Sequence, residues 1–179
     1  MLSNLTHQLL IRLSMTVGIF LLPITSALSE ELNLTAVEAN AYYTIEMAKQ
    51  VTWPDESGFN QFVVGIIGGD KLLNRAFENY ASVMVRGKKF IIEHIDIDHL
   101  EPERFAIIFT SNIARSKNRQ VFINFAESLI IVEGKVDKSN QMISFFTSGS
   151  KMRIRLNRDN ISARGFKISV NLLEMAGTK

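Results

Sequence analysis

The spacing of apolar and polar positions predicts the first helix of the chain over residues 34–51. Apolar side chains recur at steps of three and four residues, as on the buried face of an amphipathic helix: Leu34, Val37, Ala41, Ile45 and Ala48. Thr35 is suited to cap the start of this helix, because Glu38 follows three positions later. Trp53 and Pro54 end it, since a proline disfavours helical geometry at the residue before it.

Apolar runs and helical patterns alternate through the middle of the chain. Strands are expected at three continuous or alternating apolar stretches: residues 61–67, 89–97 and 104–109. Helices are expected between and after them, over about 71–80 and from Ser111 or Asn112 to about 126. This alternation favours an α/β sandwich with some parallel pairing, because parallel strands are usually connected through a helix.

The last third of the chain holds three more short strands and a closing amphipathic segment. The strands are expected at 128–133, 142–146 and 152–156, and the closing helix lies within 165–176. Turn residues at 147–150 indicate a β-hairpin between the last two strands, so the sheet is mixed. The predicted fold is therefore one α/β domain over residues 34–177, a sandwich with a mixed β-sheet flanked by helices, a C-terminal β-hairpin and a closing helix.

The amino terminus has the three-part layout of a secretory signal. Arg12 precedes an apolar run, and small residues at 25–27 permit cleavage after Ala27, with a second choice two residues later. An uncleaved membrane anchor is the alternative, but only 17 residues separate Arg12 from Glu30, whereas a membrane-spanning helix needs about 20. The sequence therefore predicts a cleaved signal peptide at 1–27, export, and no membrane insertion of the mature protein.

The composition narrows the classes of function. With 179 residues, 46% of them hydrophobic, the chain can form one substantial core. The formal net charge is only +2, which gives no support to nucleic-acid binding, since that needs a clustered basic surface. The chain has no cysteine, and this excludes disulfides, thiolate chemistry and thiolate-bound zinc.

Gly68, Gly69 and Asp70 follow a predicted buried strand and precede a predicted helix. Backbone amides at such a turn can bind an anion, and the carboxyl end of a strand is the usual place for a small-ligand crevice. The pattern lacks a third spaced glycine and a following Gly-Lys-Ser/Thr, so a tight turn is the simpler explanation. These three residues are nevertheless the best candidates for a ligand-binding site.

A second candidate site lies in the predicted strand 89–97 and just after it. His94, Asp96 and Asp98 would share one face of a strand and could bind a metal ion there. A half-exposed strand with a solvated polar face gives the same pattern, and we favour that interpretation, so no metal site is assigned. The sequence also lacks serine-nucleophile and zinc-helix motifs. We therefore predict that the protein is not an enzyme and has no cofactor.

Basic and apolar residues alternate in the second strand of the predicted hairpin: Lys151, Met152, Arg153, Ile154, Arg155 and Leu156. Any half-buried strand alternates in this way, and charges protect an edge strand against unwanted pairing. The functional alternative is a basic stripe that meets an acidic partner or lipid head groups. The structural interpretation is the simpler one, and both stay open.

Four blocks of sequence follow one another in a distinctive order: 38–54, 62–70, 105–111, and a last block made of 143–146, 152–157 and 165–176. The first block ends in a Trp-Pro pair, and the second ends in the glycine turn. The last block is the most specific, because a strand, Asn157, a short helix and paired leucines appear in order. Together the blocks resemble the YfiR-like family of bacterial periplasmic proteins over about residues 36–176.

The resemblance implies a periplasmic regulatory protein that represses an inner-membrane diguanylate cyclase. Such a protein binds the periplasmic sensory domain of the cyclase and so lowers cyclic di-GMP and biofilm formation. Tighter binding to one conformation of a receptor shifts its population without any chemistry. Two departures matter: the missing cysteines put redox sensing in doubt, and Asn140 and Gln141 stand where the family often has a glycine pair.

Contact with a protein partner should depend on a few aromatic and arginine anchors. The expected contact residues are Phe145, Phe146, Arg153, Arg155, Phe166 and Ile168. The two adjacent phenylalanines would point to opposite faces of a strand, which leaves one of them free to be exposed. Alternatively, the phenylalanines are core residues.

A function of a different class also remains open. The protein could be a periplasmic small-molecule-binding sensor that acts on another membrane signalling partner, with its ligand beside residues 68–70. A homodimer is compatible with either role, and the sequence does not specify its interface.

Overall fold

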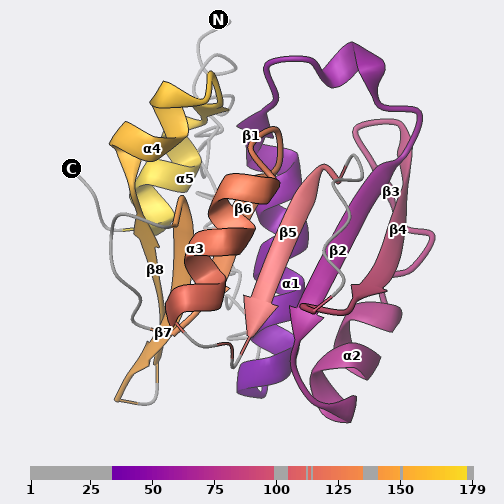
Figure 1. Ribbon diagram of the computed structural model, residues 1–179, viewed down its shortest axis with the longest axis vertical. Helices are drawn as coiled ribbons and strands as arrows, with labels where there is room; N and C mark the ends of the chain where they lie inside the picture. The colour runs from indigo at the N-terminus through magenta and orange to yellow at the C-terminus, as the bar shows by residue number, and fades with distance from the viewer. Residues whose placement is uncertain are drawn as a thin grey trace, which may run out of the picture. The chain divides into compact units, whose positions relative to one another are not determined.

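The computed structural model describes residues 34–98, 105–111, 113, 115–134, 141–149 and 151–176 (Figure 1). The chain divides into two units, Met1–Leu32 and Asn33–Lys179, and all described residues belong to the second. Several predictions lie outside the described residues, namely the signal peptide at 1–27 and the placements of Arg104, Asn112, Asn140 and Ser150. No helix within the described ranges is long and apolar enough to cross a membrane.

Seven strands form one sheet in the part of the chain that the structure describes. Its centre consists of five parallel strands, in the spatial order β4 (Lys88–Ile95), β2 (Phe62–Gly68), β5 (Ile107–Ser111), β6 (Leu129–Glu133) and β7 (Ile143–Ser148). Antiparallel strands stand at the two ends, β3 (Met84–Val85) beside β4 and β8 (Lys151–Leu156) beside β7. The predicted mixed sheet and C-terminal hairpin are therefore confirmed.

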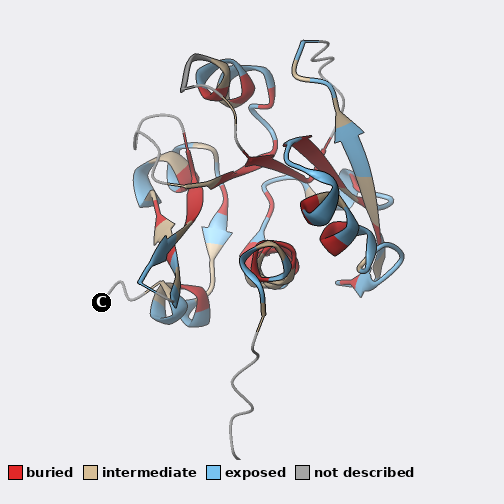
Figure 2. Cartoon of the chain, turned by 90° about the horizontal axis from the view of Figure 1, so that it is seen from below, coloured by how far each residue is buried: buried red, intermediate tan, exposed pale blue. Residues whose placement is uncertain are grey.

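Helices cover both faces of this sheet (Figures 1 and 2). Helices α1 (Ala36–Gln50) and α2 (Lys71–Glu78) lie on one face, where Phe77 packs against Phe109 with ring centroids 5.0 Å apart. Helix α3 (Arg115–Asn124) covers β5 and β6 on the other face. Strand β5 is buried along its whole length, as the continuous apolar run predicted for a strand covered on both faces. The α/β fold class is confirmed.

Helix α1 begins where its sequence specifies. The hydroxyl of Thr35 accepts a hydrogen bond from the backbone N–H of Glu38 at 3.4 Å, and the Glu38 carboxylate accepts one from the Thr35 N–H at 2.9 Å. This is the predicted capping box. The Glu38 carboxylate also accepts from the Thr35 hydroxyl, and these bonds, the hydroxyl's first, hold the pKa of Glu38 below its ordinary value.

Strand β5 and helix α3 are displaced from their predicted bounds. Ser111 or Asn112 was expected to open the helix, but β5 continues through Ser111 because this residue pairs with Gly68 of β2. Helix α3 begins only at Arg115. Pairing across the sheet therefore overrides the local tendency of a serine to cap a helix.

The closing segment contains the predicted helix, α5 (Val170–Met175), and so confirms it. It also contains a two-residue strand, β9 (Lys167–Ile168), which was not predicted. Ile168 pairs with Val51 of β1 (Val51–Thr52), and this backbone pairing interrupts the helical pattern. Before it lie helix α4 (Arg158–Ala163) and a turn, and Ser169 then caps α5 by accepting from the Leu172 N–H at 3.1 Å.

The side chain of Trp53 anchors the loop after α1 to the rest of the domain. Its side chain is only 3% exposed, and its indole N–H donates to the carbonyl of Ala106 at 2.8 Å. Its ring packs edge-on against Phe62 and Phe166, with centroids 5.0 and 6.1 Å away. One aromatic cluster thus joins the first loop, the second strand and the C-terminal segment.

Candidate functional site

The strand order places a reversal of chain direction between β2 and β5. After β2 the chain passes through α2 to β4 on one side, and it then continues with β5 on the other side. In open parallel sheets of this order, ligands bind outside the carboxyl ends of the strands at the reversal. Here those ends are Gly68 and Ser111, which face each other in the ladder. The candidate ligand residues 68–70 thus lie beside the expected crevice.

The glycine turn also has a structural explanation. The backbone φ angle is +76° at Gly68 and +87° at Gly69, in the left-handed region that favours glycine. A Cβ atom on Gly68 would lie 2.1 Å from the carbonyl oxygen of Ser111. Asp70 caps α2, since one of its carboxylate oxygens accepts from two backbone N–H groups of the helix, both at 2.9 Å. Close packing and capping account for the turn, and a ligand role for these residues stays a prediction.

A network of polar side chains joins elements at this edge of the sheet. Glu133, at the end of β6, accepts a hydrogen bond from Nδ2 of Asn40 at 2.7 Å and another from the hydroxyl of Ser111. Asn40 is fully buried, and Ser111 nearly so. The carboxylate therefore ties α1 to β5 through charge-assisted bonds. Sequence reasoning missed this network because each member lies on a different element, without a shared local pattern.

The hairpin of β7 and β8 presents the predicted basic stripe. Arg153 lies opposite Phe146 in the ladder, and Lys151 lies opposite Ser148. The Arg155 guanidinium sits over the Phe146 ring, 4.8 Å from its centroid, in a cation–π contact. Because alternate side chains of a strand share a face, the three cations and Phe146 lie on the same side of the hairpin. Phe146 is half-buried, whereas Lys151 and Arg153 are exposed.

A hollow of about 350 Å³ adjoins this face. Its lining includes Phe146, Ser148, Arg153, Ile154, Arg155, Leu156 and Ala176. Apolar walls beside arginine side chains are typical of the centre of a protein–protein contact. Three of the six predicted contact residues therefore meet at one surface.

The other three predicted contact residues lie elsewhere. Phe145 is fully buried and packs against Tyr43 and Phe109, with centroids 6.1 and 6.4 Å away. Phe166 is 3% exposed and belongs to the Trp53 cluster. Ile168 is half-buried in the separate β1–β9 pair. The two phenylalanines thus adopt the core role that the sequence left as the alternative, and neither reaches the surface.

The side chains of the candidate metal ligands His94, Asp96 and Asp98 each contact another group in the described part of the chain. His94 Nε2 lies 3.8 Å from a carboxylate oxygen of Glu78, and Asp98 pairs with Lys117. Strand β4 ends before Asp96, whose carboxylate accepts from the Asp98 N–H at 3.0 Å, so the three residues do not share a strand face. Among the described residues, no group of three His, Asp or Glu side chains is placed to hold a metal ion.

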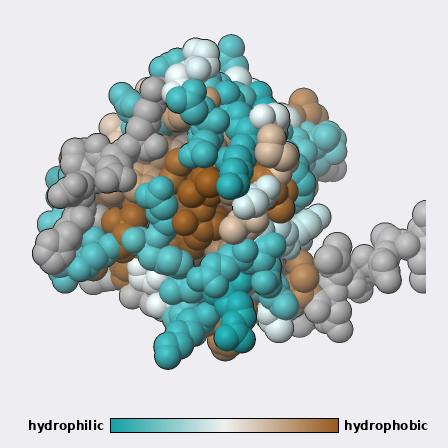
Figure 3. All heavy atoms as spheres, turned by 90° about the vertical axis from the view of Figure 1, so that its right-hand side faces the viewer, coloured by the Kyte–Doolittle hydropathy of each residue, from teal (hydrophilic) through white to brown (hydrophobic). Residues whose placement is uncertain are grey.

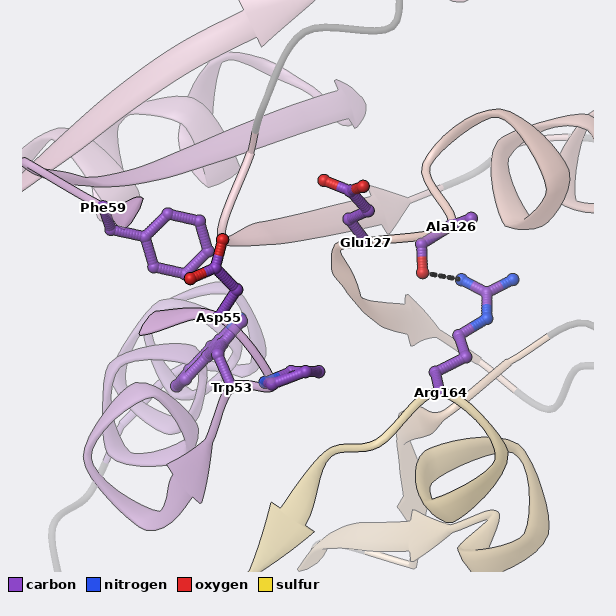
Figure 4. A pocket seen from close by; sticks show the side chains of 7 residues that line it. Trp53, Asp55, Phe59, Ala126, Glu127 and Arg164 are labelled. Carbon is purple, nitrogen blue, oxygen red and sulfur yellow. Dashed lines mark hydrogen bonds between the residues drawn. The ribbon is translucent and has the colours of Figure 1, made fainter. Parts of the chain in front are cut away.

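A pocket of about 260 Å³ lies near the amino ends of β5 and β6 (Figure 4). Trp53, Asp55 and Phe59 line one side of it, and Ala126, Glu127 and Arg164 line the other. The Arg164 guanidinium donates to three carbonyls at the end of α3, and burial lowers its pKa from the ordinary value. The arginine therefore caps α3 and fixes it to the segment after α4.

The side of the domain that carries α2, β3 and β4 has an apolar surface that was not predicted. Figure 3 faces the side that carries α2, β3 and β4, and it shows apolar residues gathered inside a hydrophilic border. Exposed large apolar side chains on or beside these elements are Leu72, Val83 and Met84. Single exposed apolar residues are common, so each carries little weight in a sequence.

The five-stranded parallel centre, with helices on both faces, defines a doubly wound α/β domain. Residues 37–177 match the family model described as YfiR/HmsC-like, so the chain belongs to that family, and the resemblance seen in the sequence is confirmed. No curated protein matches the chain. Members of the family are periplasmic regulatory proteins rather than enzymes, and membership is consistent with a role in diguanylate cyclase signalling.

Proposed function

We propose that this protein is a periplasmic repressor of an inner-membrane diguanylate cyclase. It binds the periplasmic sensory domain of the cyclase and holds the cytoplasmic catalytic domains inactive, which lowers cyclic di-GMP and biofilm formation. The observation that carries the proposal is the family match over residues 37–177, which spans nearly all of the folded unit. Export with removal of the signal peptide at 1–27 brings the protein to the side of the membrane where the sensory domain lies.

The hairpin surface of Phe146, Arg153 and Arg155 supports this role. An aromatic ring with arginines around it is the composition that most often carries binding energy in a protein contact. Repression needs no chemistry from the bound protein, only a preference for the inactive conformation of the receptor. A repressor that binds the inactive conformation about 10⁴-fold more tightly than the active one turns a mostly active receptor into a mostly inactive one.

Cellular cyclic di-GMP tests the proposal. Deletion of the gene should raise the nucleotide level, and a plasmid copy with its signal segment should restore it. A copy that lacks residues 1–27 should fail to restore it, although it makes the same folded domain. An unchanged level in the deletion strain, or equal rescue by the two copies, would contradict a periplasmic repressor.

We propose as a second candidate a sensor that binds a small molecule at the carboxyl edge of the sheet. The observation that favours it is the buried side-chain oxygen of Asn74, which has no hydrogen-bond partner in the described part of the chain. This oxygen lies 3.6 Å from the Cβ position of Gly69, beside the strand reversal, and can accept a hydrogen bond from a ligand.

A thermal-shift screen of small polar metabolites tests this candidate. A ligand that binds the folded state raises Tm as its concentration rises. The shift should disappear in Asn74→Ala and persist in Arg75→Ala, an exposed neighbour in the same helix. A shift that survives Asn74→Ala would place the ligand elsewhere.

A further inference from the structure

Strand β8 lies at one end of the sheet, and no strand in the described part of the chain pairs with its outer edge. The backbone N–H of Asn157 donates to the carbonyl of Met142, and the Phe145 carbonyl accepts from Gly134, on the side away from β8. Backbone groups alternate between the two sides of an antiparallel strand, so these bonds fix which residues of β8 point outward. The outward residues are Met152, Ile154 and Leu156.

These three residues offer a row of free backbone donors and acceptors. Within the described ranges, none of the three makes a hydrogen bond on the outer side of the strand. An exposed edge of this kind is a template for an added strand, and β-strand addition is a common mode of peptide recognition. The backbone geometry of β8 therefore fits an extended polypeptide segment.

The side chains of β8 specify the charge of that segment. None of Lys151, Arg153 and Arg155 takes part in an ion pair within the part of the chain that the structure describes. The cations stand at every second position, on one face of the strand. An added strand with acidic residues at every second position would place each carboxylate beside a cation on the same face. The adjoining hollow beside Ile154 and Leu156 can receive an apolar side chain.

We propose that the outer edge of β8 binds an extended, acid-rich segment of a protein partner, which adds to the sheet as a further strand. The inference rests on the proposed function, because the periplasmic domain of the cyclase would supply the segment. Anionic lipid shares the charge complementarity but has no backbone groups that alternate along the edge. The row of free N–H and C=O groups therefore favours a polypeptide over a membrane surface.

Amide hydrogen exchange tests the proposal directly. The mature protein is mixed with right-side-out inner-membrane vesicles from cells that lack the gene, and exchange is followed in peptides that cover residues 151–156. The amides of Met152, Ile154 and Leu156 should exchange about tenfold more slowly, as for an edge that is nine-tenths occupied. No slowing of these amides in the wild-type protein would overturn the proposal, even if the protein represses in cells.

A proline substitution supplies the matched variants. Met152→Pro removes one outward N–H, a position at which an edge strand accepts proline, and it should abolish the protection. Met84→Pro makes the same change on β3, at the opposite end of the sheet. The Phe90 N–H donates to Val83 at 2.9 Å, so by alternation the Met84 N–H points outward as well. Met84→Pro should keep the protection, and equal behaviour of the two variants would overturn the proposal.

Two further arms cover other outcomes. A thermal unfolding curve shows whether Met152→Pro folds. If it does not fold, the double variant Arg153→Glu and Arg155→Glu replaces it. Protection of the β8 amides that is retained in this double variant would refute the charge argument. Protein-free vesicles of phosphatidylethanolamine and phosphatidylglycerol should give no protection, and protection by them would assign the edge to lipid. Repression of cyclic di-GMP is measured separately and reports on the proposed function alone.

Discussion

The substitution Gly68→Ala probes the closest backbone approach at the carboxyl edge of the sheet. An alanine Cβ at this position would lie 2.1 Å from the carbonyl oxygen of Ser111, whereas real Cβ contacts are almost never closer than 3.0 Å. Strands β2 and β5 would have to separate by about 0.9 Å at this point to relieve the clash. Gly68 also has a φ angle of +76°, which disfavours alanine.

Gly87 offers a control that isolates the clash. Its φ angle is also +76°, and a Cβ there meets no atom within 4 Å. Alanine at Gly87 should therefore cost only the left-handed backbone penalty, about 1 kcal/mol. Gly68→Ala carries the same penalty and in addition weakens one or two ladder hydrogen bonds at about 1 kcal/mol each. We expect a total loss of about 2–3 kcal/mol in the free energy of unfolding for Gly68→Ala.

Urea unfolding of the mature protein, followed by circular dichroism, measures both losses. The two variants should show the same m-value as the wild type and different midpoints, with Gly68→Ala unfolding at the lower urea concentration. If the two alanines destabilise the protein equally, the close approach of β2 to the Ser111 carbonyl does not exist as described. The reversal point of the sheet would then have a different geometry.

Three further predictions concern polar groups that hold the domain together. Glu133→Ala should lower the free energy of unfolding by about 2–3 kcal/mol, because it leaves the buried Asn40 amide without its charged acceptor. Arg164→Met should lower it by about 2 kcal/mol, through loss of the charge-assisted bonds to the α3 carbonyls. Both losses are measured by urea unfolding. Glu38→Gln should lower Tm at neutral pH and have no effect in acid. Because the folded-state pKa of Glu38 is lowered, its contribution is complete above the ordinary Glu pKa and disappears as pH falls through the lowered value.

The predictions for Glu133 and Arg164 each have a control variant in the same chain. Glu127→Ala removes an exposed carboxylate near the start of β6 and should leave stability unchanged, unlike Glu133→Ala. Arg158→Met removes an exposed arginine from α4 and should likewise be neutral. Losses as large as those of the two test variants would refute the roles assigned to Glu133 and Arg164. A Tm difference for Glu38→Gln that persists in acid would show that the capping box does not depend on the charge.

Local patterns account for the parts of the fold that were predicted. The capping box at Thr35 and Glu38 is specified by four consecutive residues, and β5 by a run buried on both faces. By contrast, β9 exists because Ile168 pairs with Val51, a partner far away in the sequence. Such a contact leaves no periodic signal, so β9 was not predicted, although the closing helix was.

The candidate site was predicted in part for a similar reason. Period-two alternation separates Phe145 from Phe146 correctly but does not say which of two identical side chains faces the core. Which phenylalanine is buried depends on the face of the sheet that the helices cover. Phe145 lies on that face and is buried against Tyr43 of α1. The Glu133 network was invisible to the sequence because Asn40 comes from the first helix and Ser111 from a central strand.

The central claim is that this domain lowers cyclase output from the periplasmic face of the inner membrane. Spheroplasts of the deletion strain expose that face, and the purified mature protein can be added to the medium while intracellular cyclic di-GMP is measured. The proposed function predicts a saturable fall in cyclic di-GMP within minutes of addition, and no fall with heat-unfolded protein. Unchanged cyclic di-GMP in the presence of the folded, saturating domain would contradict it.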